Sequence, residues 1–138
     1  MATTIVTLRS ISGTEAALGW SGHHSVIVDR PAGVAGGLGL GFNGGQLLGL
    51  AIGGCFCNDL RYVAHEMGVA LASVSVEVEV EFEGTPLLAT SASLQVSIEA
   101  EDPAADLAAV LRRAKEGSTV ANSLTRGLPV SVSRRIGG

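Results

Sequence analysis

The sequence predicts an α+β protein in which antiparallel sheets pack around one buried central helix. Residues Gln46–Met67 form a long, mostly apolar segment, and Val74–Phe82 alternates strictly between apolar and polar residues before Leu88–Ile98 returns with the same period. The order of elements shows no repeated strand–helix–strand rhythm. Helices gathered on one side of an antiparallel arrangement therefore fit best.

The N-terminal part predicts strands followed by a glycine-rich connection. Thr3–Ile11 and His24–Val28 mix β-branched and polar residues, which indicates two or three antiparallel strands. Seven of the thirteen residues in Gly33–Gly45 are glycine, so we expect a loop there. Its GGLGLG run is similar to a nucleotide-binding loop, but a dinucleotide site needs a strand–helix–strand unit and a later acidic residue. An anion site at the start of the following helix stays open.

The central helix should begin in the core and surface toward its end. Its first twelve residues carry one polar side chain, Gln46, and polar residues become frequent only afterwards. The pair Gly53–Gly54 costs about 2 kcal/mol of helix propensity relative to alanine. We therefore expect another backbone segment to approach there closely. Gly68 is in the position expected of a residue that ends the helix.

The second half should form a hairpin, two helices and a last strand. The glutamates of the first hairpin strand are expected on its solvated face, and Glu83–Pro86 is expected to turn the chain. Asp102–Pro103 predicts a helix start, because aspartate caps helices and proline suits the first helical position. Gly117 should end this helix, Ser118 should cap a short helix over Thr119–Leu124, and Leu128–Ser133 should be a strand.

Composition excludes several classes of function. The 138 residues predict a single domain, 1–138, with 46% hydrophobic and 16% charged residues and a net charge of −4. Such a chain is neither disordered nor suited to nucleic acid, which requires a clustered basic face. We expect no secretory signal, no membrane span and a cytoplasmic, reducing location for the two cysteines. The high apolar content favours an oligomer.

Both cysteines, Cys55 and Cys57, lie on the central helix, about 200° apart around its axis. Cys55 shares a face with Asp59 and Tyr62, whereas Cys57 faces the side of Leu60. This divergence disfavours an intrahelical disulfide and a metal site. The other possible ligands, which are His23, His24, His65 and Asp59, show no zinc spacing. Either cysteine can be plain core packing, and a reactive thiol would need a cation nearby.

Two stretches together resemble the OsmC/Ohr family of thiol-dependent hydroperoxide reductases. The first is FNGGQLLGLAIGGCFCNDLRYVA, similar to the family's cysteine-bearing central helix. The second is AKEGSTVANSLTRGLPVSVSRR, similar to the family's later signature, in which a second cysteine precedes Pro-Val-Ser. The resemblance implies an OsmC-like fold in an intertwined homodimer, with no metal and no cofactor.

The resemblance also implies roles for particular residues. Cys55 matches the cysteine that attacks the peroxide, but Ser118 replaces the second cysteine and Gly44–Gly45 replaces the family's Pro-Glu. No arginine lies between Ile11 and Asp29, where the family's is expected. Two hypotheses follow. Cys55 is a catalytic thiol that reduces organic hydroperoxides and is regenerated by an external thiol or Cys57, or the chain is a non-catalytic dimeric protein that binds an apolar small molecule.

Overall fold

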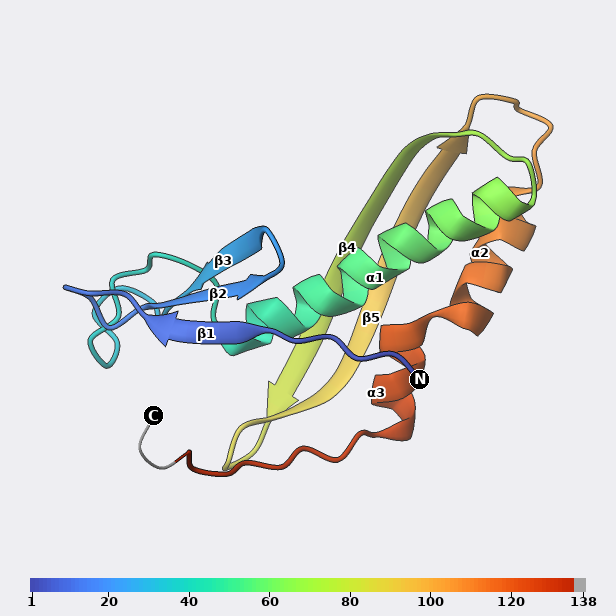
Figure 1. Cartoon of the computed structure of the whole chain (residues 1–138). Coiled ribbons are helices and arrows are strands. Elements are labelled where there is room, and N and C mark those ends of the chain that lie inside the picture. The colour runs from blue at the N-terminus through green and yellow to red at the C-terminus, as the bar shows by residue number, and fades with distance from the viewer. Residues whose placement is uncertain (136–138) are drawn as a thin grey trace. The chain divides into compact units, whose positions relative to one another are not determined.

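A computed structural model describes residues 1–135 and confirms the α+β class, with two antiparallel sheets and three helices (Figure 1). The prediction of a central helix is confirmed. The helix begins two residues earlier than expected, at Gly44, and ends one residue earlier, at Glu66. In chain order the elements are β1 (Thr7–Ser10), β2 (Ala17–Ser21), β3 (His24–Val28), α1 (Gly44–Glu66), β4 (Leu71–Glu83), β5 (Leu88–Ala100), α2 (Leu107–Gly117) and α3 (Thr119–Arg126).

Contacts within the chain divide it into two compact units, which are described separately. The first unit contains residues 1–50 and 80–91, and the second contains residues 51–79 and the chain from residue 92 onward. The helix α1 and the strands β4 and β5 each contribute residues to both units. The cysteines and Ser118 belong to the second unit.

The first unit holds a three-stranded antiparallel sheet in the order β1-β2-β3. Thr7 is paired with Trp20, and Ala17 with Val28. The middle strand lies in the segment that the sequence marked only by its turn-forming glycines. Its alternation is short and interrupted by Gly19, which is buried between Leu8 and Val26, so local pattern gave little sign of a strand.

A buried carboxylate organises the glycine-rich loop that follows β3. The Asp29 side chain is about 1% exposed and accepts hydrogen bonds from the backbone N–H groups of Leu38 (3.1 Å) and Leu40 (3.0 Å). It also accepts the N–H of Arg30, whose guanidinium lies 3.3 Å from it. A Cβ at Gly37 would lie 2.5 Å from the Arg30 carbonyl oxygen, so the loop can close only over a glycine there. The loop is therefore an ordered structure.

Asp29 should make the stability of this loop dependent on pH. The N–H groups of Leu40, Arg30 and Leu38 and the charge of Arg30 lower the pKa of Asp29 below 3.8, against the opposing effect of burial. A carboxylate with a lowered pKa stabilises the fold above the pKa of the unfolded chain and loses this contribution as pH falls through the folded value. Thermal unfolding of Asp29→Asn should start from a lower Tm at pH 7 and lose less on acidification than the unchanged chain.

The exposed Asp102 offers a matched control for this carboxylate. Asp102→Asn removes one acidic group without touching the loop, so its Tm should follow the unchanged chain from pH 7 down to pH 3. If Asp29→Asn loses as much stability on acidification as the unchanged chain does, Asp29 is not the source of the pH dependence.

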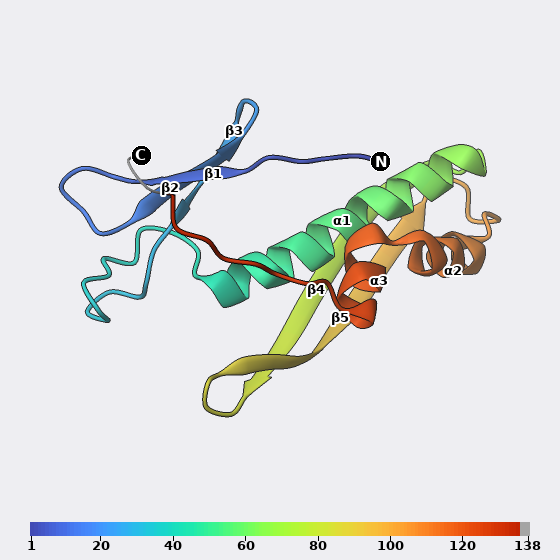
Figure 2. The same cartoon turned by 60° about the horizontal axis from the view of Figure 1, so that its bottom comes forward.

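The second unit is built around the buried face of α1. Side chains three or four positions apart, among them Phe56, Leu60 and Ala64, pack against Leu71 and against Val110 of α2. Figures 1 and 2 both show α2 beside the C-terminal half of α1. Half-buried residues of β4 and β5 complete the core, and the glutamates of β4 are exposed, as predicted.

Gly53 lies where another part of the chain approaches α1 closely. A Cβ built on Gly53 would lie 2.7 Å from a γ-methyl group of Val78 in β4, whereas one on Gly54 would meet nothing within 4 Å. The prediction of a close approach is therefore right for Gly53. The approaching group is a side chain, however, and the expected backbone contact is wrong, because β4 turns its valine toward the helix.

The predicted start of the first C-terminal helix is wrong by four residues. The helix α2 begins at Leu107, and Asp106 caps it by accepting the N–H of Ala109 at 3.1 Å. Asp102 instead accepts the N–H of Ala104 at 2.9 Å, which closes a tight turn. Either aspartate could cap a helix. Because Asp102 forms this turn, the helix starts later and Asp106 is its cap. The short helix α3 after Ser118 agrees with the prediction.

The predicted last strand is also wrong. Residues 128–133 form no strand, and the alternating side chains of Leu128, Val130 and Val132 are 56%, 82% and 95% exposed. A strand needs a neighbouring edge as well as a suitable pattern. Within residues 1–135 this segment pairs with no strand, so its pattern is left without a partner.

Candidate active site

The helix that carries both cysteines has a well-defined start. Asn43 and Gln46 cap it reciprocally: the Asn43 side chain accepts the N–H of Gln46 at 2.9 Å, and the Gln46 side chain accepts the N–H of Asn43 at 3.0 Å. This arrangement fixes the helix start although Gly44 and Gly45 follow directly. Gly68, with φ of +69°, ends the helix as predicted.

Cys55 lies on the flank of α1 beside a carboxylate. Its side chain is half-buried, and its Sγ donates a hydrogen bond to Oδ2 of Asp59, 3.6 Å away. Asp59 is also half-buried and lies one helical turn further along. The helix therefore holds the sulfur and the carboxylate together through its own geometry, as the shared face predicted.

Cys57 is a second free, half-buried thiol. Its position on the helix is about 200° from Cys55, so the two Cβ atoms point in diverging directions. Among residues 1–135, no side chain forms a hydrogen bond with the Cys57 thiol. The geometry makes Cys57 independent of the Cys55–Asp59 pair.

Ser118 is fully buried, with 0% exposure, and its Oγ has no hydrogen-bond partner within residues 1–135. The prediction that Ser118 caps α3 is wrong, because it stands in the cap position but its side chain makes no capping hydrogen bond. It lies at a cavity of about 430 Å³ that Cys55 does not line. The lining residues are Phe56, Leu94, Val96, Leu111, Lys115, Ser118, Ala121 and Asn122. No sequence pattern predicts this cavity, because it forms only where α1, β5, α2 and α3 meet.

The arginines with described partners are bound to other groups. Arg9 stacks over the ring of Trp20 at 5.8 Å, and Arg30 binds Asp29 and the carbonyl oxygen of Glu15. Arg61 donates to the backbone and Arg112 lies 4.0 Å from Glu116. The Cys55 thiol thus contacts the carboxylate of Asp59, whereas these four arginines contact other groups.

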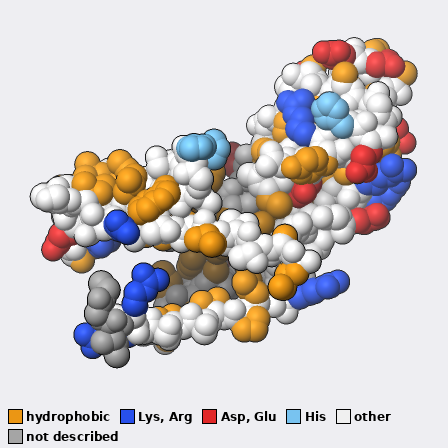
Figure 3. Space-filling model, in the orientation of Figure 1, with side chains coloured by type: hydrophobic (Ala, Val, Ile, Leu, Met, Phe, Trp, Pro, Cys, Tyr) orange, Lys and Arg blue, Asp and Glu red, His pale blue; other side chains and the backbone are white. Residues whose placement is uncertain are grey.

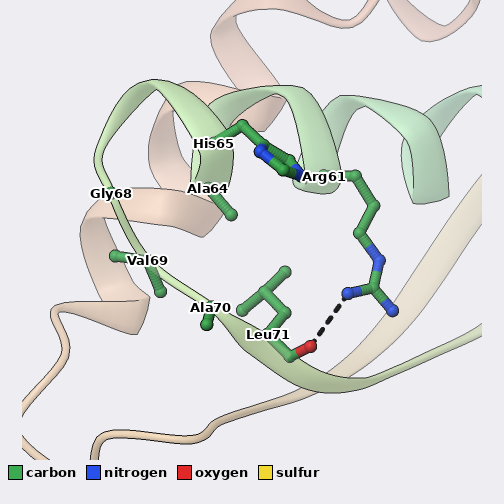
Figure 4. A pocket seen from close by; sticks show the side chains of 7 residues that line it. All are labelled: Arg61, Ala64, His65, Gly68, Val69, Ala70 and Leu71. Carbon is green, nitrogen blue, oxygen red and sulfur yellow. Dashed lines mark hydrogen bonds between the residues drawn. The ribbon is translucent and has the colours of Figure 1, made fainter.

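A second cavity, of about 370 Å³, lies beside the C-terminal end of α1 (Figure 4). Figure 4 shows Arg61 reaching across it to the carbonyl oxygen of Leu71, which accepts a hydrogen bond from Nη1 at 2.9 Å. His65 lies on the same side of the helix, one turn further on. The arginine thereby ties the end of α1 to the start of β4, which is a structural role.

The described part of the chain contains neither a metal-ligand cluster nor a membrane-spanning helix. Between residues 1 and 135, no three His, Cys, Asp or Glu side chains gather as a metal site. In the same range no helix is long and apolar enough to cross a membrane.

The fold defines the class of protein, and sequence comparison then gives the family. The chain has the architecture of α+β proteins with an OsmC-like fold. The sequence profile of the OsmC-like protein family matches residues 36–133, so the chain belongs to this family. A comparison with curated protein sequences found no match.

Solved structures share this fold. An OsmC-like protein from Mycoplasma pneumoniae has a TM-score of 0.73 at 13% identity, over 90% of this chain and 88% of that one. An OsmC-like protein of unknown function from Vibrio cholerae has a TM-score of 0.71 at 12% identity, over 88% and 91%. An organic hydroperoxide resistance protein from Legionella pneumophila has a TM-score of 0.57 at 23% identity, over 90% of each chain. At these identities the likeness shows the fold alone.

Proposed function

We propose that this protein reduces organic hydroperoxides with Cys55 as the attacking thiol. The observation that carries the proposal is a free, half-buried thiol on α1. By the sequence resemblance, its position corresponds to that of the attacking cysteine. The sulfur attacks the terminal peroxide oxygen, so that an S–O bond forms as the O–O bond breaks. The sulfur becomes a sulfenic acid, the peroxide leaves as an alcohol, and two electrons pass from sulfur to oxygen.

An external thiol completes the proposed cycle. Ser118 cannot form a disulfide, because it carries a hydroxyl where a resolving residue needs a thiol. Cys57 would have to leave its helical direction to reach Cys55. One external thiol therefore condenses with the sulfenic acid and releases water, and a second reduces the mixed disulfide and restores Cys55.

The proposal includes a homodimer in a reducing, cytoplasmic location. Apolar side chains gather on the surface over the region of the β1–β3 sheet in Figure 3. At and just before β1, Leu8, Ile5 and Val6 are 53%, 74% and 59% exposed. A second copy of the chain would remove such surface from water. The two free thiols suit a reducing compartment. Light scattering of the purified protein tests for the mass of a dimer.

Cys55→Ser should abolish hydroperoxide consumption, because a serine hydroxyl cannot be oxidised to a sulfenic acid. The measurement is the loss of an organic hydroperoxide in the presence of excess dithiol, followed for the unchanged chain and the variant. We expect turnover by the unchanged chain and no rate above the uncatalysed reaction for Cys55→Ser.

Cys57→Ser is the matched control, since it removes the other thiol of the same helix and should keep the turnover. Equal turnover by the chain without Cys55 would contradict the proposal. Loss of turnover in the chain without Cys57 would instead make Cys57 the resolving thiol and refute regeneration by an external thiol alone.

A second candidate is a non-catalytic dimeric protein that binds an apolar small molecule. The cavity beside Phe56 and Ser118 favours it, since most of its lining is apolar and Lys115 and Asn122 add polar groups. Absence of peroxide turnover, together with thermal stabilisation by small apolar carboxylates, would support this candidate against the first.

A further inference from the structure

The Cys55 thiol touches a carboxylate where thiol enzymes ordinarily place a cation. Its Sγ lies 3.6 Å from Oδ2 of Asp59 and donates a hydrogen bond to it. The contact joins residues one turn apart in the middle of an uninterrupted helix. The neighbouring Phe56 and Leu60 are 4% and 0% exposed and anchor this part of α1 in the core. The pair is therefore held in place by the fold.

A carboxylate in this position changes how the thiol can react. Thiols attack as thiolates, and a nearby cation favours that form. Asp59 does the opposite, because a thiolate beside a carboxylate is repelled by a like charge. The thiol proton therefore has to leave as the sulfur attacks, and the hydrogen bond already directs it to Asp59.

We propose that Asp59 is a catalytic residue that accepts the Cys55 proton during attack and returns it to the leaving alkoxide. This inference rests on the proposed peroxide reduction. As the S–O bond forms and the O–O bond breaks, the proton moves from Sγ to Oδ2. The alkoxide then takes it and leaves as an alcohol, so Asp59 ends ionised and Cys55 ends as a sulfenic acid.

Asp59 is the polar side chain in contact with the Cys55 thiol, and two arginines of the chain are engaged elsewhere. Gly44–Gly45 lacks the family's glutamate, and Arg30 and Arg61 are bound to other groups. In the proposed reaction the thiol proton passes to Asp59 as the sulfur attacks. A positioned acid–base group of this kind typically contributes about 100-fold or more to a rate.

Two rates measured on Asp59→Asn distinguish proton transfer by Asp59 from a purely structural role of this residue. The first is alkylation of Cys55 by iodoacetamide, measured by mass spectrometry, and the second is reduction of an organic hydroperoxide with excess dithiol. Alkylation should become about five-fold faster, since removal of a like charge in contact with sulfur relieves roughly the repulsion expected in water. The ratio of the peroxide rate to the alkylation rate should fall about 100-fold.

Asp59→Glu supplies the conservative control, because it keeps a carboxylate on the same helix and should recover much of the lost ratio. Unchanged ratios in Asp59→Asn, with peroxide reduction rising in step with alkylation, would overturn the inference and leave Asp59 as a group that only restrains the thiol. Circular dichroism confirms that the variants are folded. Peroxide consumption that persists in Cys55→Ser would refute the proposed function itself, which is a separate outcome.

Discussion

Leu60→Ala is expected to lower the free energy of unfolding by about 2–5 kcal/mol, the usual cost of removing a large buried aliphatic side chain. Leu60 has 0% exposure and lies in the cluster that joins α1 to Leu71, Val110 and Ala114. Its neighbours belong to three different elements, which cannot all move inward to fill the space. Urea unfolding followed by circular dichroism measures the change.

Leu50→Ala, in the same helix, is the matched control because Leu50 is 52% exposed. Substitutions at such positions usually change stability by about 0.5 kcal/mol or less. An equal loss for both variants would contradict the prediction, because it would mean that the cluster around Leu60 carries less of the stability than its burial implies. Helix propensity cannot cause such a loss, since alanine is the best helix former.

Gly53→Ala is expected to destabilise the protein by about 1–3 kcal/mol, the range observed when atoms are forced into a packed core. The new Cβ would lie 2.7 Å from a γ-methyl group of Val78, so β4 or the helix would have to move. Valine has one preferred rotamer in most settings and cannot easily turn away. The same urea titration measures the loss.

Gly54→Ala reverses the sign of the effect at the next residue. A Cβ there meets nothing within 4 Å, and alanine favours the helix over glycine by about 1 kcal/mol. Opposite signs at neighbouring positions would separate packing from propensity. A gain in stability for both variants would contradict the close approach of Val78.

The elements with strong local patterns were predictable, and those decided by distant contacts were not. The apolar run of α1 and the alternation in β4 identify both elements and the buried face of each. Asp102 and Asp106 are equally good caps, so only the turn that forms at Asp102 selects between them. The segment 128–133 has the pattern of a strand and no edge to join within the described chain.

Only the part of the candidate site that lies within the single helix α1 was predictable. Helical spacing places Asp59 on the face of Cys55, and the structure has their side chains in hydrogen-bond contact. The unsatisfied hydroxyl of Ser118 and its cavity depend on four elements that meet in space. The Asp29 carboxylate likewise binds amides nine and eleven residues away, which no periodic pattern encodes.

The exposed segment 128–133 after α3 contains and is followed by residues that oppose aggregation. Alternating β-branched residues in the open, such as Val130 and Val132, are the kind of sequence that nucleates intermolecular cross-β stacking. Pro129 interrupts the row of backbone donors, and Arg134 and Arg135 place two positive charges directly after the apolar alternation. Such flanking residues act as gatekeepers. The chain can therefore leave this surface open during synthesis without inviting copies of itself to aggregate.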